Sequence, residues 1–185
     1  MITEAKFKKA LREMMLSSPL RDITVRALCE YCGSHRQTFY YHYQDIYDLL
    51  NSVFLGEQVP GFSEAAEPDA NLKAIQAYAK DNFAFLRAAY NSAASELPDD
   101  FFFSKVMTSY FGYYSKHPLG TLSKEGARVA CRRFARMVAD EYSYLFHNQE
   151  VTPLRFDRLM NRYLNVAKEK LFPAIVEATA EERKH

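Results

Sequence analysis

The feature that most constrains this chain is a pair of short helix-forming segments on either side of Gly33. Thr24 is a suitable N-cap for the first segment, because its hydroxyl can accept a hydrogen bond from a free backbone N–H. An apolar stripe with the spacing i, i+3, i+4 and i+7 follows it, formed by Val25, Leu28, Cys29 and Cys32. A glycine directly after such a stripe suits the left-handed residue that ends a helix. Two helices joined by this kind of turn make a helix-turn-helix, whose second helix enters the major groove of DNA.

The second segment, about residues 36–41, has an apolar side and a polar side. Phe39 and Tyr43 lie four residues apart, so they are expected to anchor the helix on the core. The side chains left facing outward nearly all donate hydrogen bonds, and they are Arg36, Gln37, Thr38, Tyr40, Tyr41 and His42. A solvated face that happens to be polar is the alternative, but so many donors on one short helix favour a surface that contacts DNA.

The chemistry of these side chains suits a duplex. Arg36 can bind guanine O6 and N7, and Gln37 can pair with adenine N6 and N7, from the end of the helix that penetrates deepest. Tyr41 can pack on a sugar or on a thymine methyl group. The donors suited to phosphate oxygens are Thr38, Tyr40 and His42. Further backbone contacts are expected from the preceding segments, through Thr24, Arg26, Lys6, Lys8 and Lys9.

The rest of the chain shows helical periodicity and no strand-like alternation of useful length, which predicts an all-α fold. A first helix is expected over residues 3–17, with an apolar side formed by Ala5, Phe7, Leu11, Met14 and Met15. A fourth helix is expected to begin at Asp45, which is spaced like a capping box with Asp48. Its inner face is expected to comprise Ile46, Leu49, Leu50, Val53 and Phe54.

Two domains are expected, and a loop over residues 56–70 lies between their helical regions. Residues 1–50 form the three-helix DNA-binding domain, and residues 51–185 form a helical regulatory, ligand-binding and dimerisation domain. The long helices of the second domain are expected over residues 71–91, 98–116, 123–149 and 152–182. Pro173 is expected to kink or end the last of them, because proline removes a backbone donor.

Charge and composition narrow the functional classes. The net charge is +1, so no global field drives the chain onto nucleic acid, and the placement of individual charges must decide. The first residues lack the pattern of a secretion signal, and no apolar stretch reaches the roughly 20 residues that span a bilayer. We therefore expect a cytoplasmic protein that does not enter the membrane. No phosphate-binding glycine loop, Gly-x-Ser-x-Gly or His-Glu-x-x-His motif occurs, so we expect neither an enzyme nor a cofactor.

Cys29 and Cys32 form a Cys-x-x-Cys motif with His35 and His42 nearby. A zinc or redox site is one interpretation of this group. The other, which we favour, is that both thiols are small core residues on one helical face, so no metal is expected.

The motif Thr-Phe-Tyr-Tyr-His-Tyr at residues 38–43 follows a glycine turn and precedes an acidic-capped helix ending in Leu49-Leu50. In these features the first 45 or so residues resemble the N-terminal domain of the TetR family of bacterial transcriptional regulators. Within that family, the sequence of residues 36–49 is most similar to that of regulators associated with the dihydroxyacetone-kinase operon. The resemblance implies a homodimer on a palindromic DNA operator, and a C-terminal domain that senses a ligand and dimerises through its last two long helices.

The chain departs from the family pattern at three positions. The family usually has an apolar residue where Ser34 stands and a Ser or Thr N-cap where His35 stands, which indicates a differently capped turn. It often has a phosphate-binding Lys where Ile46 stands, so one backbone contact is expected to be missing.

The C-terminal part is rich in aromatic residues, which can line an effector pocket or simply fill a core. The candidate ligand-binding residues are Tyr78, Asn82, Phe85, Tyr110, Tyr114, Phe134 and Tyr142. A row of arginines can bind an anionic effector or a protein partner, or lie on a solvated face paired with Asp140, which we favour; it comprises Arg128, Arg132, Arg133 and Arg136. The last helix has an apolar stripe that suits both the core and a dimer seam, formed by Leu159, Met160, Tyr163, Leu164, Ala167, Leu171 and Ile175.

The pattern as a whole predicts a dimeric regulator controlled by an unknown small-molecule effector or partner protein. An effector bound among the middle helices would shift the fourth helix and change the spacing of the two DNA-reading helices. The alternative is a co-regulator that acts mainly through a protein partner and binds DNA weakly on its own.

Overall fold

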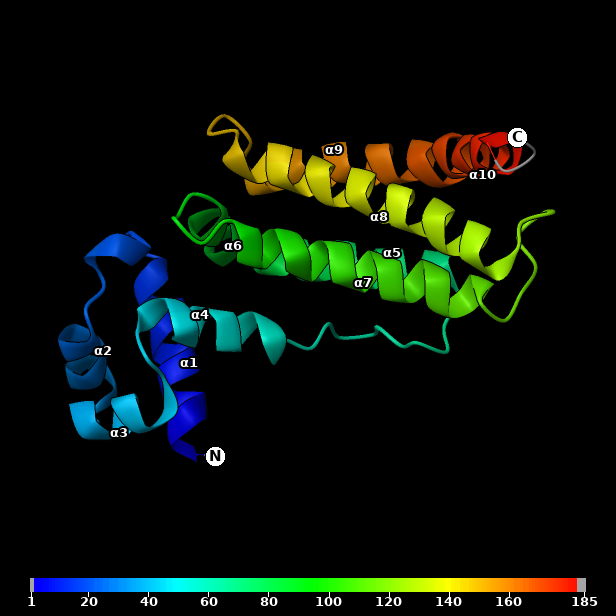
Figure 1. The fold of residues 1–185 in the computed structure, drawn as a ribbon. Coiled ribbons are helices and arrows are strands. Elements are labelled where there is room, and N and C mark those ends of the chain that lie inside the picture. The colour runs from blue at the N-terminus through cyan, green and yellow to red at the C-terminus, as the bar shows by residue number, and fades with distance from the viewer. Residues whose placement is uncertain (1, 183–185) are drawn as a thin grey trace. The chain divides into compact units, whose positions relative to one another are not determined.

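The structure, a computed structural model, describes residues 2–182, and all regular elements in this range are helices (Figure 1). The predicted all-α fold is therefore confirmed. The elements in chain order are α1 (Ile2–Met15), η1 (Leu20–Asp22), α2 (Val25–Cys32), α3 (Arg36–His42), α4 (Ile46–Leu55), α5 (Pro68–Asp81), α6 (Phe83–Tyr90), α7 (Glu96–Tyr114), α8 (Lys124–His147), α9 (Pro153–Val166), η2 (Ala167–Leu171) and α10 (Phe172–Glu182). None of these helices is both long enough and apolar enough to cross a membrane.

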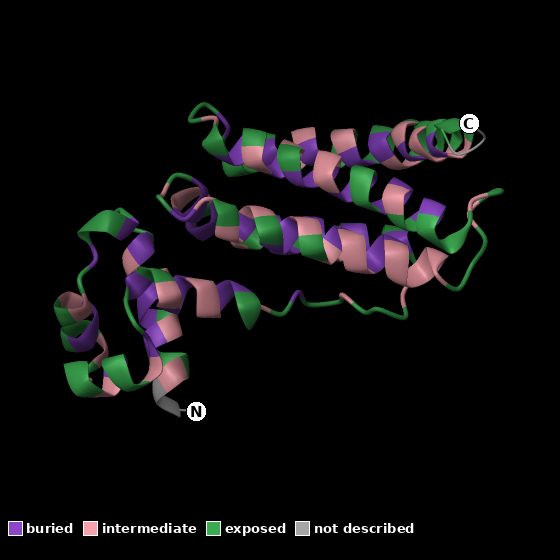
Figure 2. Cartoon of the chain, viewed as in Figure 1, coloured by how far each residue is buried: buried purple, intermediate pink, exposed green. Residues whose placement is uncertain are grey.

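The chain groups into two units by its internal contacts. The first comprises the residues up to Glu57 together with Asn82–Pro98, and the second comprises Gln58–Asp81 together with the residues from Asp99 onward. The first unit thus contains α6 as well as the N-terminal helices. In each unit the buried residues follow the inner sides of the helices (Figure 2).

The turn between α2 and α3 has the local chemistry that the sequence predicts. The Thr24 hydroxyl accepts a hydrogen bond from the Ala27 N–H at 3.1 Å and so caps α2. Gly33 is left-handed, with φ 63° and ψ 42°, and the following Ser34 N–H donates to the Cys29 carbonyl at 2.9 Å. This arrangement ends α2 and sends the chain directly into α3.

Three aromatic rings hold the helix-turn-helix on α1. The rings of Phe7 and Phe39 meet edge to face with centroids 5.4 Å apart, and Phe7 meets Tyr43 in the same way at 6.3 Å. All three side chains are buried. Phe39 and Tyr43 therefore anchor α3 as predicted, and edge-to-face contacts of this kind are favourable beyond the burial alone.

Two carboxylates cap the start of helix α4, one at the N-cap residue and one three residues later. Asp45 accepts from the Asp48 N–H at 2.8 Å, and Asp48 accepts from the Gln44 N–H at 3.0 Å, one residue before the bond of a standard capping box. The predicted inner face of this helix is confirmed, since its members are all buried: Ile46, Leu49, Leu50, Val53 and Phe54.

Arg12 of α1 connects three segments of the first unit. Its guanidinium donates to Glu57 at 2.6 Å and to Asn82 at 2.5 Å, and it lies 4.2 Å above the ring of Phe85. Phe85 in turn stacks on Phe54 of α4. Glu57 and Asn82 are the residues at which the chain leaves the first unit and returns to it, so Arg12 fixes both points.

The second unit is a bundle of helices around an aromatic core. Helix α8 packs against α9 and α10, and α5 packs against α9. Large side chains with almost no exposed surface fill the centre, among them Phe102, Phe134, Tyr142, Phe146 and Phe156. Two consecutive hydrogen bonds link polar side chains in this core. The Tyr142 hydroxyl donates to the Gln76 side chain at 3.2 Å, and the Gln76 side chain donates to the Asp157 carboxylate at 3.2 Å.

Three expectations about the helices need correction. The helix predicted over residues 71–91 is two helices, because Asn82 has φ −107° and ψ 21° and interrupts the ladder between α5 and α6. The first helix ends at Met15, two residues early, and Ala5 on its expected apolar side is exposed.

The last helix is disturbed near Pro173, as predicted, but by a change of helix type. Residues Ala167–Leu171 form a π-helical turn in which the Phe172 N–H donates to the Ala167 carbonyl. Pro173 has no N–H, and its ring crowds the carbonyl four residues earlier, that of Glu169, within this turn. The wider turn accommodates the proline without ending the helix.

Replacing Gly33 by alanine is expected to lower the free energy of unfolding of the first unit by about 1–2 kcal/mol, since an L side chain is disfavoured in the left-handed region. A Cβ at Gly33 would meet no atom within 4 Å, so crowding does not contribute. Urea unfolding measures the change. Gly112→Ala in α7 is the matched control, because its Cβ would meet only the Glu64 carbonyl oxygen at 4.0 Å, and it is expected to stabilise by about 0.5–1 kcal/mol. An unchanged stability of Gly33→Ala would contradict the capping role.

Candidate nucleic-acid interface

The polar side of α3 is exposed in the structure. Arg36 and Gln37 in its first turn are exposed, and Tyr40 and Tyr41 show 58% and 85% of their surface to solvent. Thr38 is half-buried. A short helix that buries Phe39 and displays two tyrosines, an arginine and a glutamine has the shape and the donors that a major groove requires.

His42 does not lie on the outer side, and that part of the prediction is wrong. Its side chain is only 19% exposed, and Nδ1 lies 3.2 Å from a carboxylate oxygen of Glu4. The cause is its position three residues after the buried Phe39, which turns His42 toward α1. The ring of His42 also meets that of Tyr41 edge to face, with centroids 5.0 Å apart.

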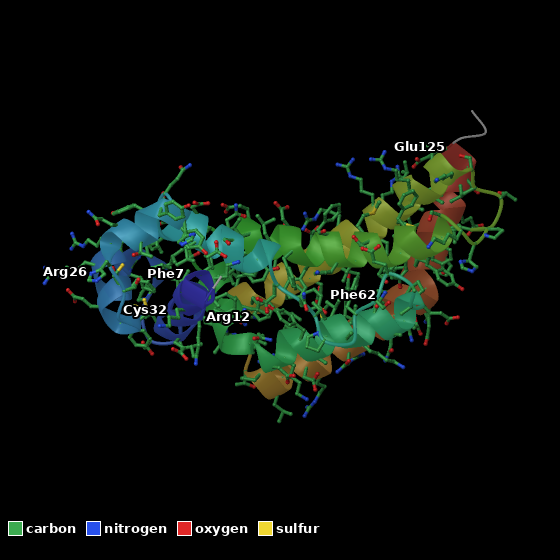
Figure 3. All side chains as sticks on the ribbon, turned by 90° about the horizontal axis from the view of Figure 1, so that it is seen from below. Phe7, Arg12, Arg26, Cys32, Phe62 and Glu125 are labelled. Carbon is green, nitrogen blue, oxygen red and sulfur yellow. The ribbon has the colours of Figure 1, made fainter. Side chains whose placement is uncertain are left out.

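Most of the cations expected to contact the DNA backbone have partners within the protein. Arg26 on α2 points outward from the first unit (Figure 3), but its guanidinium bonds to Glu30 at 2.7 Å. Lys9 lies 3.8 Å from Glu13 in the next turn of α1. Lys6 is exposed. The first unit thus presents few cations that lack a nearby carboxylate.

Lys8 differs more sharply from its expected role. Its ammonium donates to the Ser52 carbonyl at 2.8 Å, near the end of α4. There it interacts favourably with the negative end of the α4 dipole. Lys8 therefore connects α1 to α4, and a phosphate contact is no longer the role that its position favours.

The turn before α3 is capped differently from the family pattern, as the departure at His35 predicts. The His35 side chain forms no cap on α3, although the residue occupies the N-cap position. Ile46 is buried and serves the core. Its neighbour Tyr47 is 41% exposed in the first turn of α4 and carries a hydroxyl. Sequence reasoning missed Tyr47, whose signal was an aromatic residue on the polar side of an amphipathic helix.

The Cys-x-x-Cys motif lies within the packing of the first unit. Cys29 is buried, and burial raises the pKa of its thiol. Cys32 is half-buried, and its thiol lies 3.8 Å from the Cys29 carbonyl, to which it can donate. In the described part of the chain no group of His, Cys, Asp and Glu side chains is arranged to hold a metal ion.

The seven candidate ligand-binding residues do not form one site. Asn82 and Phe85 belong to the first unit, where both contact Arg12. Tyr78 packs on Phe101, and Tyr142 stacks on Phe102 at 4.1 Å, both in the core of the second unit. The remaining three surround Phe172 near the π-helical turn: Tyr110, Tyr114 and Phe134. Spacing along the sequence did not indicate this separation, because it depends on which helices pack together.

The arginines of α8 are mostly paired, as expected. Arg136 bonds to Asp99 at 2.6 Å and to the predicted partner Asp140 at 3.0 Å. Arg133 bonds to Glu182 at 2.8 Å, and Arg128 lies 3.6 Å from Glu125. Arg132 is exposed. On the last helices Met160, Leu164 and Ala167 are buried within the chain, and the rest of the stripe is half-buried, namely Leu159, Tyr163, Leu171 and Ile175.

Comparisons with known proteins place the fold. No protein-family profile matches the chain, and no curated protein sequence matches it. A solved structure described as the dihydroxyacetone kinase operon activator DhaS is similar, with a TM-score of 0.68 and 19% sequence identity. The match covers 90% of this chain and 94% of that one. At this identity the likeness establishes a shared fold over nearly the whole chain.

We predict that a thiol reagent applied to the native protein at pH 8 modifies Cys32 first and leaves Cys29 and Cys131 protected. The reason is burial, which raises the pKa of Cys131 to about 12 and also raises that of Cys29. Mass spectrometry after timed labelling measures the order, and Cys32→Ala serves as the control. Stoichiometric zinc in the purified protein, or equal protection of Cys29 and Cys32, would contradict the interpretation as core thiols.

Proposed function

We propose that this protein is a sequence-specific, DNA-binding transcriptional regulator of the TetR type, acting in the cytoplasm as a homodimer on a palindromic operator. The first unit binds the operator, and the second unit dimerises and binds an effector. The observation that carries the proposal is α3, a short helix held by buried Phe39 and Tyr43 that exposes Arg36, Gln37 and two tyrosines. In a helix-turn-helix protein this is the helix that reads the major groove.

The fold supports the proposal. A protein described as an operon activator shares the fold over 90% of the chain. The motif at residues 38–43 independently resembles the N-terminal domain of TetR regulators, within which residues 36–49 favour the subgroup associated with the dihydroxyacetone-kinase operon. A regulatory protein without enzymatic activity is the function on which the two likenesses agree.

The last long helices are the surface that we assign to dimerisation. Three large apolar side chains are exposed along α8 and α9, where a second copy would cover them: Tyr144, Leu154 and Val166. A two-fold dimer places two α3 helices about one duplex turn apart, roughly 34–36 Å, and so selects an inverted repeat.

A co-regulator that works mainly through a protein partner is the second candidate. The specific observation in its favour is that cations near α3 have carboxylate partners, since Arg26 bonds to Glu30 and Lys9 lies 3.8 Å from Glu13. Phosphate neutralisation supplies most of the non-specific affinity of DNA-binding proteins, so such a surface binds DNA weakly without base contacts. Exposed tyrosines also suit a protein interface.

Selection of binding sites from a pool of random duplexes is expected to yield an inverted repeat with half-sites about one helical turn apart. On that site, Arg36→Ala is expected to cost about 1–3 kcal/mol of binding free energy and to relax the base preference at one position of each half-site. Arg21→Ala, which removes an exposed arginine from η1, controls for the change in charge. Fluorescence anisotropy at two salt concentrations measures the affinities. Failure to enrich any duplex, with the dimer intact, would leave the co-regulator as the remaining function.

Glu30→Gln is expected to strengthen DNA binding several-fold. The slope of the logarithm of the binding constant against the logarithm of the salt concentration is expected to steepen by the amount that corresponds to about one more neutralised phosphate for each protomer. The substitution removes the carboxylate that holds Arg26 at 2.7 Å, so the guanidinium becomes available to a phosphate. The double variant Arg26→Ala with Glu30→Gln is the control and should lose the gain. Unchanged affinity in Glu30→Gln would show that Arg26 lies outside the interface.

A further inference from the structure

A groove of about 600 Å³ opens on the second unit, where the end of α7 and the turn at residues 119–121 face η2 and α10. Its volume is in the range of ligand pockets, which is roughly 300–1,000 Å³. The candidate ligand residue Tyr114 contributes to its wall, together with Phe172, the first residue of α10. The DNA-binding residues play no part in it.

The floor of the groove is aromatic. Phe172 is buried, and its ring lies 5.4 Å from that of Tyr114, 4.9 Å from that of Tyr110 and 5.0 Å from that of Phe134. Tyr114 is half-buried, and burial raises the pKa of its phenol, which therefore stays neutral. These contacts pack the Tyr114 and Phe172 rings against those of Tyr110 and Phe134.

The π-helical turn supplies the wall opposite α7. Lys168, Phe172 and Val176 follow one another along one line of the last helices and all contribute to the groove. The turn lies at the Lys168 end of this line, beside Pro173, which also lines the groove. π-type turns occur preferentially at functional sites, and this one borders the cavity.

The charges at the groove are arranged for a cation. Among the described residues that line the groove, the one cationic side chain is that of Lys168, and it lies 2.8 Å from a carboxylate oxygen of Asp69, which neutralises it. Glu177 and Glu181, one turn apart on α10, also line the groove and are exposed. Neither of the two forms an ion pair or a hydrogen bond through its side chain with another residue in the range 2–182. Within residues 2–182, the unpaired charges of the lining are therefore negative and lie beside the aromatic side chains of Tyr114 and Phe172.

We propose that this groove binds an organic cation with an aromatic or otherwise apolar body, held between the Tyr114 and Phe172 rings and the carboxylates of Glu177 and Glu181. A cation over an aromatic face is attracted by the ring quadrupole, and the carboxylates add a favourable Coulomb interaction. The proposal deepens the proposed function, because it assigns the effector of the second unit to a chemical class. An anionic ligand would instead face two carboxylates and a lysine that is already paired.

Tetraphenylphosphonium and tetraphenylborate test the charge preference directly, because the two ions have nearly the same shape and opposite charges. Isothermal titration calorimetry of the full chain without DNA is expected to show binding of tetraphenylphosphonium at least about tenfold tighter than that of tetraphenylborate. Because no DNA is present, failure of this test and failure of the DNA-binding proposal are distinguishable.

Two variants locate the site. Glu177→Gln with Glu181→Gln is expected to weaken tetraphenylphosphonium binding about five- to tenfold, with little effect on tetraphenylborate. Val176→Trp is expected to fill the groove and abolish the binding of both ions. Asp100→Asn with Glu150→Gln removes the same charge from exposed positions elsewhere in the second unit and should bind like the unmodified protein. Circular dichroism melting curves check that each variant is folded.

Equal affinity for the two ions, or unchanged phosphonium binding in the Glu177 and Glu181 variant, would overturn the proposal. A second copy of the chain is the competing occupant, and sedimentation of Val176→Trp detects it. A change in its oligomeric state would show that the groove is an interface between copies, which also overturns the proposal. An unchanged state with lost phosphonium binding would support it.

Discussion

The contacts of Arg12 are the interaction on which the first unit most depends. A guanidinium offers donors in a planar fork, so one side chain reaches Glu57 and Asn82 at once and still stacks on Phe85. A lysine has no such plane and would not satisfy all three. The same helix α1 carries Phe7, which holds α3 through Phe39. Helix α1 thus contacts both α3 and the two residues at which the chain leaves the first unit and returns to it.

Few unpaired cations lie near the exposed side of α3 in the described part of the first unit. Nucleic-acid-binding surfaces typically display clustered lysines and arginines, whereas here Glu30 pairs with Arg26 and Glu13 lies near Lys9. Exposed Tyr40 and Tyr41 provide hydroxyl donors and flat rings without adding charge. Under the proposed function, such a surface would gain affinity from base and sugar contacts more than from the phosphate field, which would favour discrimination between sequences over general attraction to DNA.

In the second unit a single proline has consequences for both the fold and the groove. Pro173 cannot donate to the helical ladder, and the π-helical turn beside it absorbs the defect. The turn brings Lys168 against Asp69 and borders a cavity whose floor is Phe172 and Tyr114. A local irregularity in the backbone thus borders a groove of about 600 Å³.

The sequence by itself determined the features that depend on neighbours along the chain. Spacing and backbone chemistry within one or two turns predict the Thr24 cap, the left-handed Gly33 and the acidic start of α4 at Asp45. They also predict that Phe39 and Tyr43 are buried. Only the tertiary structure decided that His42 meets Glu4, that Lys8 reaches Ser52, that the chain breaks at Asn82, and that the aromatic residues separate into distinct clusters. These are contacts between residues far apart in the sequence, and helical periodicity fixes which face a side chain is on but not which helix lies opposite.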